Sequence, residues 1–126
     1  MMQVLVVDDS ALVRRQVAAT LIGQGFAVVE AFDGQDAREK LEKFPDLKLV
    51  VCDVTMPRMS GLEFLHAIRY EGKHLDLPVI MLTTEGRPEM IAQAKQLGAK
   101  GWLIKPLKPE LLLATVAKIS GAMKAA

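Results

Sequence analysis

"VLVVDDS", residues 4–10, joins four consecutive apolar residues to two adjacent carboxylates, Asp8 and Asp9, and a serine. An uninterrupted apolar run of this kind is typical of a strand that is covered on both faces, as in a parallel sheet. Two like charges side by side repel each other, which costs stability unless a positive charge compensates them. The stretch therefore predicts a buried strand that ends at a polar site.

Four further apolar runs follow along the chain, and segments with helical spacing separate them. The runs are "FAVVEA" (26–31), "LKLVVC" (47–52), "LPVIML" (77–82) and "WLI" (102–104). Helices are predicted over 11–22, 33–41, 60–68, 88–97 and 109–119. This alternation predicts an α/β fold, with five parallel strands and helices in right-handed crossovers.

Local signals mark several of the predicted helix ends. Asp33 is a favoured N-cap, and Ser60 with Glu63 three residues later resembles a capping box. Gly98 follows the fourth helical segment as a C-terminal stop.

Length and composition predict one folded domain, residues 1–126, without an output domain. Of the 126 residues 51% are hydrophobic and 25% charged, and the net charge is +1, which gives no electrostatic reason to expect a nucleic-acid partner. No apolar run is long enough for membrane insertion, and the N-terminus lacks signal-peptide features. The single cysteine, Cys52, cannot form an internal disulfide. We therefore expect a cytoplasmic protein.

Polar side chains follow four of the five apolar runs. They are Asp8 and Asp9, Asp53, Thr83 and Thr84, and Lys105. Because the carboxyl ends of parallel strands share one edge of the sheet, these side chains are expected to lie together. Carboxylates brought together favour a hard cation such as Mg²⁺, which keeps several waters and often takes phosphate oxygens as further ligands.

A lysine and a hydroxyl beside such a metal would suit an incoming phosphoryl group. Lys105 would supply a second positive charge and Thr83 a hydroxyl donor, so that catalysis is mostly positioning and charge stabilisation. One of the carboxylates would then act as the nucleophile, since aspartate is an established phosphoryl acceptor.

With these residues, the chain resembles the receiver domain of two-component response regulators, of the single-domain CheY-like type. The resemblance covers nearly the whole chain and is carried by the acidic pair, "DVTMPRMSG" (53–61), "LTTE" (82–85) and "KP" (105–106). It implies a doubly wound sheet with strand order 2-1-3-4-5. The acidic pair and the third acid would meet between strands one and three.

The resemblance also assigns roles at the acidic edge. Asp53 would be the phosphoacceptor, supplied by a histidine kinase or phosphotransfer protein. Asp9 and Asp53 would bind Mg²⁺ directly together with the backbone carbonyl of Thr55, and Asp8 would act through water. Thr55 and Glu85 would flank the phosphoryl group at positions that influence its hydrolysis.

The remaining family positions concern the switch and its support. Phosphoryl-binding and switch positions are Thr83, Thr84, Lys105 and Trp102, and structural positions are Pro57, Gly61 and Pro106, with a cis peptide expected before Pro106. The fourth helix, fifth strand and fifth helix would form the face that binds a downstream target protein. The family usually has Tyr or Phe where this chain has Trp102, and an indole is bulkier and offers only an N–H donor.

Two uses remain open for a monomeric regulator of this type. It would bind a target protein directly, as in chemotaxis, or it would serve as a phosphorelay intermediate or phosphate sink. Such a protein is not a dedicated enzyme, although it promotes its own phosphorylation and dephosphorylation.

Other classes fit the sequence less well. A Mg²⁺-dependent phosphohydrolase with an Asp nucleophile needs a second Asp two residues later, where Thr55 stands. A nucleotide- or flavin-binding module would have a glycine- or hydroxyl-rich phosphate loop instead of two anions. Taken alone, Asp8, Asp9 and Ser10 also fit a helix N-cap, but a cap accounts for one acid and leaves the second uncompensated. The simplest interpretation of Arg14 and Arg15 is a solvated helix face, with a kinase or target contact as the alternative.

Overall fold

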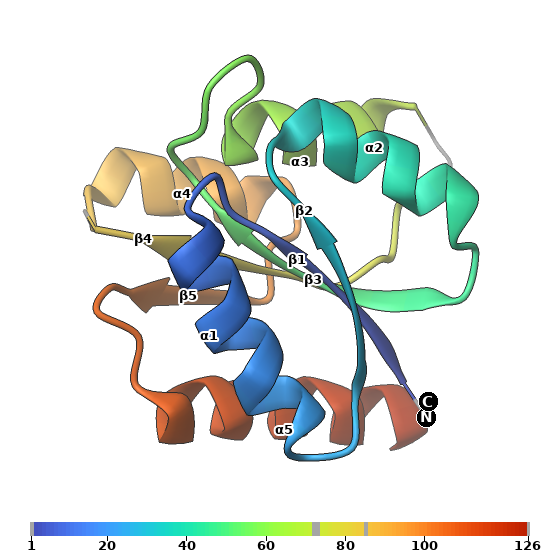
Figure 1. Ribbon diagram of the computed structural model, residues 1–126. Coiled ribbons are helices and arrows are strands. Elements are labelled where there is room, and N and C mark those ends of the chain that lie inside the picture. The colour runs from blue at the N-terminus through green and yellow to red at the C-terminus, as the bar shows by residue number, and fades with distance from the viewer. Residues whose placement is uncertain (1, 72–73, 85, 126) are drawn as a thin grey trace.

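The computed structural model describes residues 2–71, 74–84 and 86–125, with side chains up to residue 121. Strands and helices alternate along the whole described chain (Figure 1). The strands are β1 (Gln3–Val7), β2 (Ala27–Ala31), β3 (Leu47–Asp53), β4 (Val79–Thr83) and β5 (Gly101–Ile104). The helices are α1 (Ala11–Ile22), α2 (Gly34–Lys43), α3 (Gly61–Tyr70), α4 (Pro88–Gln96) and α5 (Pro109–Ala125).

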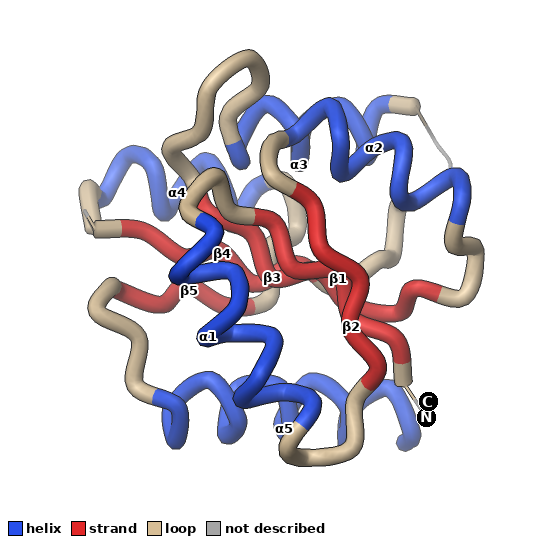
Figure 2. Tube along the Cα trace, in the orientation of Figure 1, coloured by secondary structure: helices blue, strands red, loops and turns tan. Residues whose placement is uncertain are grey.

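The strands form one parallel sheet in the order β2-β1-β3-β4-β5. Helices α2, α3 and α4 cover one face, and α1 and α5 cover the other (Figures 1 and 2). The predicted fold and strand order are therefore confirmed. Because the order reverses at β1, the adjacent ends of β1 and β3 diverge toward helices on opposite faces, which is where ligand sites form in such sheets.

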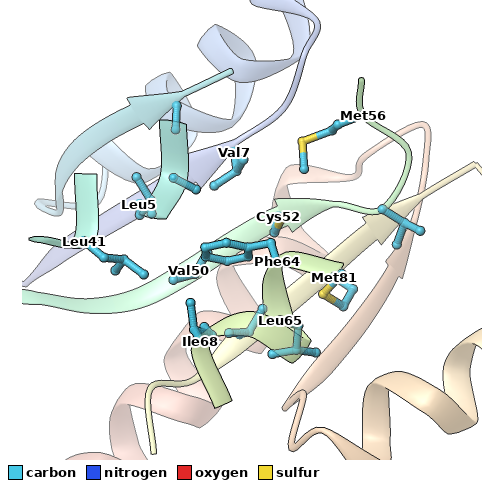
Figure 3. Packing of buried hydrophobic residues seen from close by; sticks show 14 of the residues in the cluster. Leu5, Val7, Leu41, Val50, Cys52, Met56, Phe64, Leu65, Ile68 and Met81 are labelled. Atoms are coloured by element: carbon cyan, nitrogen blue, oxygen red, sulfur yellow. The ribbon is translucent and has the colours of Figure 1, made fainter. Parts of the chain in front are cut away.

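Each face of the sheet has its own hydrophobic core, because alternate residues of a strand point to opposite faces. On the α2–α4 side, Leu5 and Val7 contribute to a cluster centred on Phe64 (Figure 3). On the α1–α5 side, Val4 and Val6 pack with residues of those two helices. Burial on both faces explains why the strand sequences are continuously apolar.

The predicted helix caps are present. Asp33 accepts a hydrogen bond from the backbone of Asp36 at the start of α2, and Ser60 and Glu63 form the complete capping box of α3. Gly98, just after α4, has φ +81°, a left-handed conformation that glycine adopts without steric cost.

Three helices extend further than the sequence predicts. Helix α2 continues to Lys43 instead of Leu41, α3 to Tyr70 instead of Ile68, and α5 to Ala125 instead of Ile119. A single glycine costs an α-helix only about 1 kcal/mol, so Gly121 does not end α5 when alanine and lysine follow it. No helix within the described residues is long and apolar enough to cross a membrane.

Candidate functional site

Three carboxylates meet where β1 and β3 end. One oxygen from each of Asp8, Asp9 and Asp53 lies within 4.8 Å of the other two. Asp8 and Asp53 are almost fully buried, at 1% and 5% exposure, whereas Asp9 is exposed. The cluster thus has a buried floor and one side that faces solvent.

Lys105, at the end of β5, brings a positive charge to this cluster. Its Nζ lies 2.9 Å from Asp8 Oδ2 and 3.2 Å from Asp53 Oδ1. Burial alone would lower the pKa of Lys105, but the hydrogen bond to Asp8 and the charges of both carboxylates outweigh it and raise this pKa. The lysine therefore stays charged. The peptide between Lys105 and Pro106 is cis, as the resemblance implied.

Asp53 remains an unfavourable place for a negative charge despite this lysine. Burial and the neighbouring charge of Asp8 raise the pKa of Asp53, and Lys105 only partly opposes them. Cys52 lies on the other face of β3, within the α2–α4 core. Burial and the charges of Asp53 and Asp8 raise the pKa of its thiol, so Cys52 is an inert core residue.

The donor set fits a hard divalent cation. Its atoms are carboxylate oxygens, which Mg²⁺ prefers, and the exposed Asp9 leaves room for the waters that Mg²⁺ retains. The three carboxylates carry more negative charge than Lys105 can balance, and a divalent cation would neutralise the remainder. Thr55 is exposed in the loop that leaves the buried end of β3, next to this cluster in the chain.

The predicted phosphoryl-binding and switch residues lie on β4 and β5 or directly after them. Thr83 ends β4 and is buried, and its carbonyl accepts a hydrogen bond of 2.7 Å from the backbone N–H of Lys105. Thr84 follows it and is exposed. Glu85, which was predicted to flank the phosphoryl group, lies outside the described residues.

Trp102 is not part of the carboxylate cluster. It pairs with Met81, two residues before the end of β4, and packs against the α2–α4 core. Its indole Nε1 is buried and has no hydrogen-bond partner within the described part of the chain. The ring is thus half-buried beside α4.

Gly61 and the two prolines support the loops around the site. A Cβ on Gly61 would lie 2.1 Å from the carbonyl oxygen of Asp53, so only glycine lets α3 begin this close to the end of β3. Its N–H donates to the carbonyl of Val54. Pro57 and Pro106 are exposed in the loops that follow β3 and β5.

Arg14 contacts the acidic pair, which the sequence analysis did not predict. Its Nη1 donates to the backbone carbonyl of Asp8 at 2.8 Å, and its Nε pairs with Glu30 at 3.1 Å. The interpretation of Arg14 as a solvated helix face is therefore wrong. The available signal was its position four residues after the N-cap Ser10, because helical side chains lean back toward the N-terminus and so toward the preceding strand.

A doubly wound 2-1-3-4-5 sheet with three acids and a lysine at its carboxyl edge defines the receiver class of signalling domains. The comparisons with known proteins agree: the family model for the response regulator receiver domain matches residues 4–117. The chain belongs to this family, whose members are signalling proteins rather than dedicated enzymes.

Its relatives include chemotaxis proteins. A chemotaxis protein CheY homolog of Campylobacter jejuni is 40% identical over 112 residues, which cover 88% of this chain and 86% of the relative. The structure of Vibrio cholerae CheY4 is 42% identical, with a TM-score of 0.87 over 94% of this chain and 98% of that one. A CheX-CheY-BeF3-Mg²⁺ complex from Borrelia burgdorferi is similar at 31% identity and a TM-score of 0.87, over 94% of this chain and 88% of that one.

Proposed function

We propose that this chain is a phosphoacceptor switch in which Asp53 receives a phosphoryl group from a phosphohistidine of a partner protein. The observation that carries the proposal is the convergence of Asp8, Asp9 and Asp53 beside Lys105. Membership in the receiver family supports it, because that family is defined by phosphate signalling in two-component systems.

Asp53 would be the nucleophile in this transfer. A carboxylate oxygen of Asp53 forms a new bond to phosphorus while the N–P bond of the phosphohistidine breaks, and the imidazole keeps the electron pair and takes up a proton. Burial and the charge of Asp8 raise the pKa of Asp53 in the metal-free chain, and a bound cation would favour the ionised carboxylate that the reaction needs.

Lys105 and Thr83 would hold the transferred group. Lys105 already contacts Asp53 Oδ1 at 3.2 Å, so its ammonium is placed to donate a hydrogen bond to a phosphoryl oxygen on that carboxylate. Thr83 and Thr84, at the end of β4, would donate hydroxyl hydrogen bonds to the same group. Of these donors, the Lys105 ammonium is already held beside Asp53 before the reaction, and such prior placement makes electrostatic stabilisation of a phosphoryl group most effective.

Asp9, Asp53 and the carbonyl of Thr55 would hold Mg²⁺, and Asp8 would act through a bound water. When bound, the cation would neutralise the carboxylates and the incoming phosphoryl oxygens. The Borrelia burgdorferi relative, whose complex contains both BeF3 and Mg²⁺, supports this assignment.

The output of the switch would be a change in the face formed by α4, β5 and α5. Two large apolar side chains on it, Ile104 and Leu111, are about half exposed, which suits contact with a target protein. Trp102 on β5 would report or assist the change. The chemotaxis relatives favour a chemotaxis-like pathway.

The experiment is phosphorylation by acetyl phosphate with Mg²⁺, followed by intact-mass measurement. We expect one base-labile phosphoryl adduct on the wild-type chain and none on Asp53→Asn. Lys105→Ala should keep the fold, as judged by circular dichroism, and lose most of the adduct. An adduct that persists in Asp53→Asn would contradict the assignment of the phosphoacceptor.

A further inference from the structure

The loop from Val54 to Ser60, which joins β3 to α3, contacts the junction between β2 and α2. The N–H of Gly34 donates to the carbonyl of Met59 at 3.3 Å. A Cβ on Gly34 would lie 2.6 Å from Met59 Cγ and 2.9 Å from its carbonyl oxygen. The close approach of the two loops therefore requires glycine at position 34.

Arg58, at the tip of this loop, pairs with Asp33. Its Nε and Nη2 both lie 2.5 Å from Asp33 Oδ2, while Asp33 Oδ1 accepts the capping hydrogen bond of Asp36 at 2.8 Å. Asp33 is 1% exposed, whereas the side chain of Arg58 is 60% exposed. The arginine therefore neutralises a buried carboxylate whose position is already set by α2.

The same guanidinium also stacks on an aromatic ring. Arg58 Cζ lies 5.6 Å from the ring centre of Phe32, a distance typical of a cation–π contact. Phe32 is half exposed, so the contact covers part of an apolar surface that would otherwise face water. Arg58 thus makes an ion pair and a stacking contact with the same short segment.

The backbone of Arg58 is in a conformation that arginine adopts at a cost. Its φ is +66°, in the left-handed region that favours glycine. It is the single non-glycine residue with positive φ within the described residues. A residue keeps a strained backbone conformation only where contacts with its surroundings hold it there, and Arg58 has such contacts with Asp33 and Phe32.

We infer that Arg58, Asp33 and Phe32 form a latch that holds the β3–α3 loop in the conformation required for Mg²⁺ binding. The loop is fixed at its ends by β3 and by Gly61, and the latch fixes it between them. The inference rests on the proposed function, in which the carbonyl of Thr55 in this loop binds the cation. Arg58 is a positioning residue, since it acts through the loop.

Electrostatics and positioning predict opposite effects for Arg58→Ala. Removal of a positive charge near three carboxylates should by itself tighten Mg²⁺ binding. If the latch positions Thr55, the same substitution should weaken binding, because outer-shell partners of metal ligands typically contribute tenfold or more in affinity. The sign of the change therefore separates the two mechanisms.

The test is calorimetric titration of the metal-free chain with Mg²⁺. We expect Arg58→Ala to bind about tenfold more weakly than wild type and Arg58→Lys to fall between them. Arg15→Ala is the matched control: it removes one exposed arginine from α1, and its Mg²⁺ affinity should be equal to or slightly above that of wild type.

Arg58→Gly separates positioning from stability. Glycine relieves the left-handed backbone, so the melting temperature of this variant should stay at or above that of Arg58→Ala while its Mg²⁺ affinity stays low. Amide hydrogen exchange in EDTA tests the loop contact without metal. Exchange of the Gly34 N–H should be faster in Arg58→Ala and Arg58→Gly than in wild type, because its hydrogen bond to Met59 depends on the latch.

Asp33→Asn tests the partner without loss of the helix cap, since asparagine is as good an N-cap as aspartate. Combined with Arg58→Ala, it should add little further loss of Mg²⁺ affinity. The latch is overturned if Arg58→Ala binds Mg²⁺ as tightly as wild type, or if Gly34 exchange is unchanged. If wild type neither binds Mg²⁺ nor accepts phosphate, the proposed function fails and the latch with it.

Discussion

Asp53 is a buried carboxylate whose charge the metal-free protein stabilises poorly. Burial and the charge of Asp8 raise the pKa of Asp53 above its ordinary value of 3.8. Substitution with asparagine removes this charge, and Lys105 keeps Asp8 as a partner at 2.9 Å. We therefore expect Asp53→Asn to increase the free energy of unfolding in EDTA at pH 7, by on the order of 1 kcal/mol, measured by urea denaturation.

The pH dependence of this difference has a definite sign. Because the pKa of Asp53 is higher in the folded state than in the unfolded state, the folded chain binds more protons in the window between the two values. The stability of the wild-type chain falls as pH rises through that window, so the advantage of Asp53→Asn should be small near pH 3.8 and should grow as the pH is raised above it. The exposed Asp46→Asn is the control, and a pH-independent advantage for Asp53→Asn would count against this cause.

Arg14 stabilises the backbone of the acidic pair. Its side chain is mostly buried and donates to the carbonyl of Asp8, so Arg14→Ala leaves that carbonyl without its charged donor. We expect a loss of about 1–2 kcal/mol in the free energy of unfolding. Arg15→Ala, on an exposed position of the same helix, should change stability much less, and equal losses in the two variants would contradict the role of Arg14.

For single residues, the sequence predicted the chemical role of a side chain better than the direction in which the side chain points. Asp8, Asp9, Asp53 and Lys105 were predicted to form a site because polar residues follow four of the five apolar runs, and the carboxyl ends of parallel strands share one edge of the sheet. Arg14 was missed because a charged residue on an amphipathic helix is ordinary, and its contact with a carbonyl depends on where the preceding strand lies.

Among the helices, α3 depends on the glycine at its first position for its place beside β3. Gly61 places its first turn against the carbonyl of Asp53, where a Cβ would lie 2.1 Å away. Gly61→Ala must push α3 or the end of β3 aside, with an expected cost of about 1–3 kcal/mol in the free energy of unfolding. We also expect Asp53 of this variant to be phosphorylated more slowly by acetyl phosphate, as measured by intact-mass spectrometry over time.

Ser60→Ala is the control for that substitution. It removes the capping box of the same helix, which should cost about 1 kcal/mol, but it adds no atom next to Asp53. Its phosphorylation rate should therefore stay near that of wild type. If both variants are phosphorylated equally slowly, the effect comes from a weakened α3 and not from the contact with Asp53.

The sequence predicted the start of a helix correctly where a side chain forms the capping hydrogen bond. The predictions of Asp33 and Ser60 as N-caps are confirmed, because each side chain replaces a missing backbone acceptor for the first N–H groups of a helix. The end of α5 was not predicted correctly, since Gly121 is both a common helix stop and a tolerated interior residue. The latch between Arg58 and Asp33 was also invisible, because it joins residues 25 positions apart in two loops.

In the whole molecule, the site exists because the sheet brings together residues that are remote in sequence. Asp8 and Lys105 are separated by 97 positions and yet are in contact through the carboxyl ends of β1 and β5. Parallel strands place all such ends on one edge, so correct prediction of the fold was sufficient to predict that these strand-end charges meet, although not the contacts of Arg14 and Arg58. The distances and the balance of burial and charge at Asp53 required the structure.

Mg²⁺ should stabilise the whole chain, because a ligand that binds the folded state alone shifts the unfolding equilibrium toward that state. At 100 times the dissociation constant the gain is about 2.7 kcal/mol, visible as a rise in melting temperature with Mg²⁺ concentration. Asp9 is exposed, so Asp9→Asn should leave the melting temperature in EDTA close to that of wild type while it removes most of the Mg²⁺-dependent rise. Sodium chloride at equal ionic strength controls for screening, and an unchanged Mg²⁺ response in Asp9→Asn would show that the cation binds elsewhere.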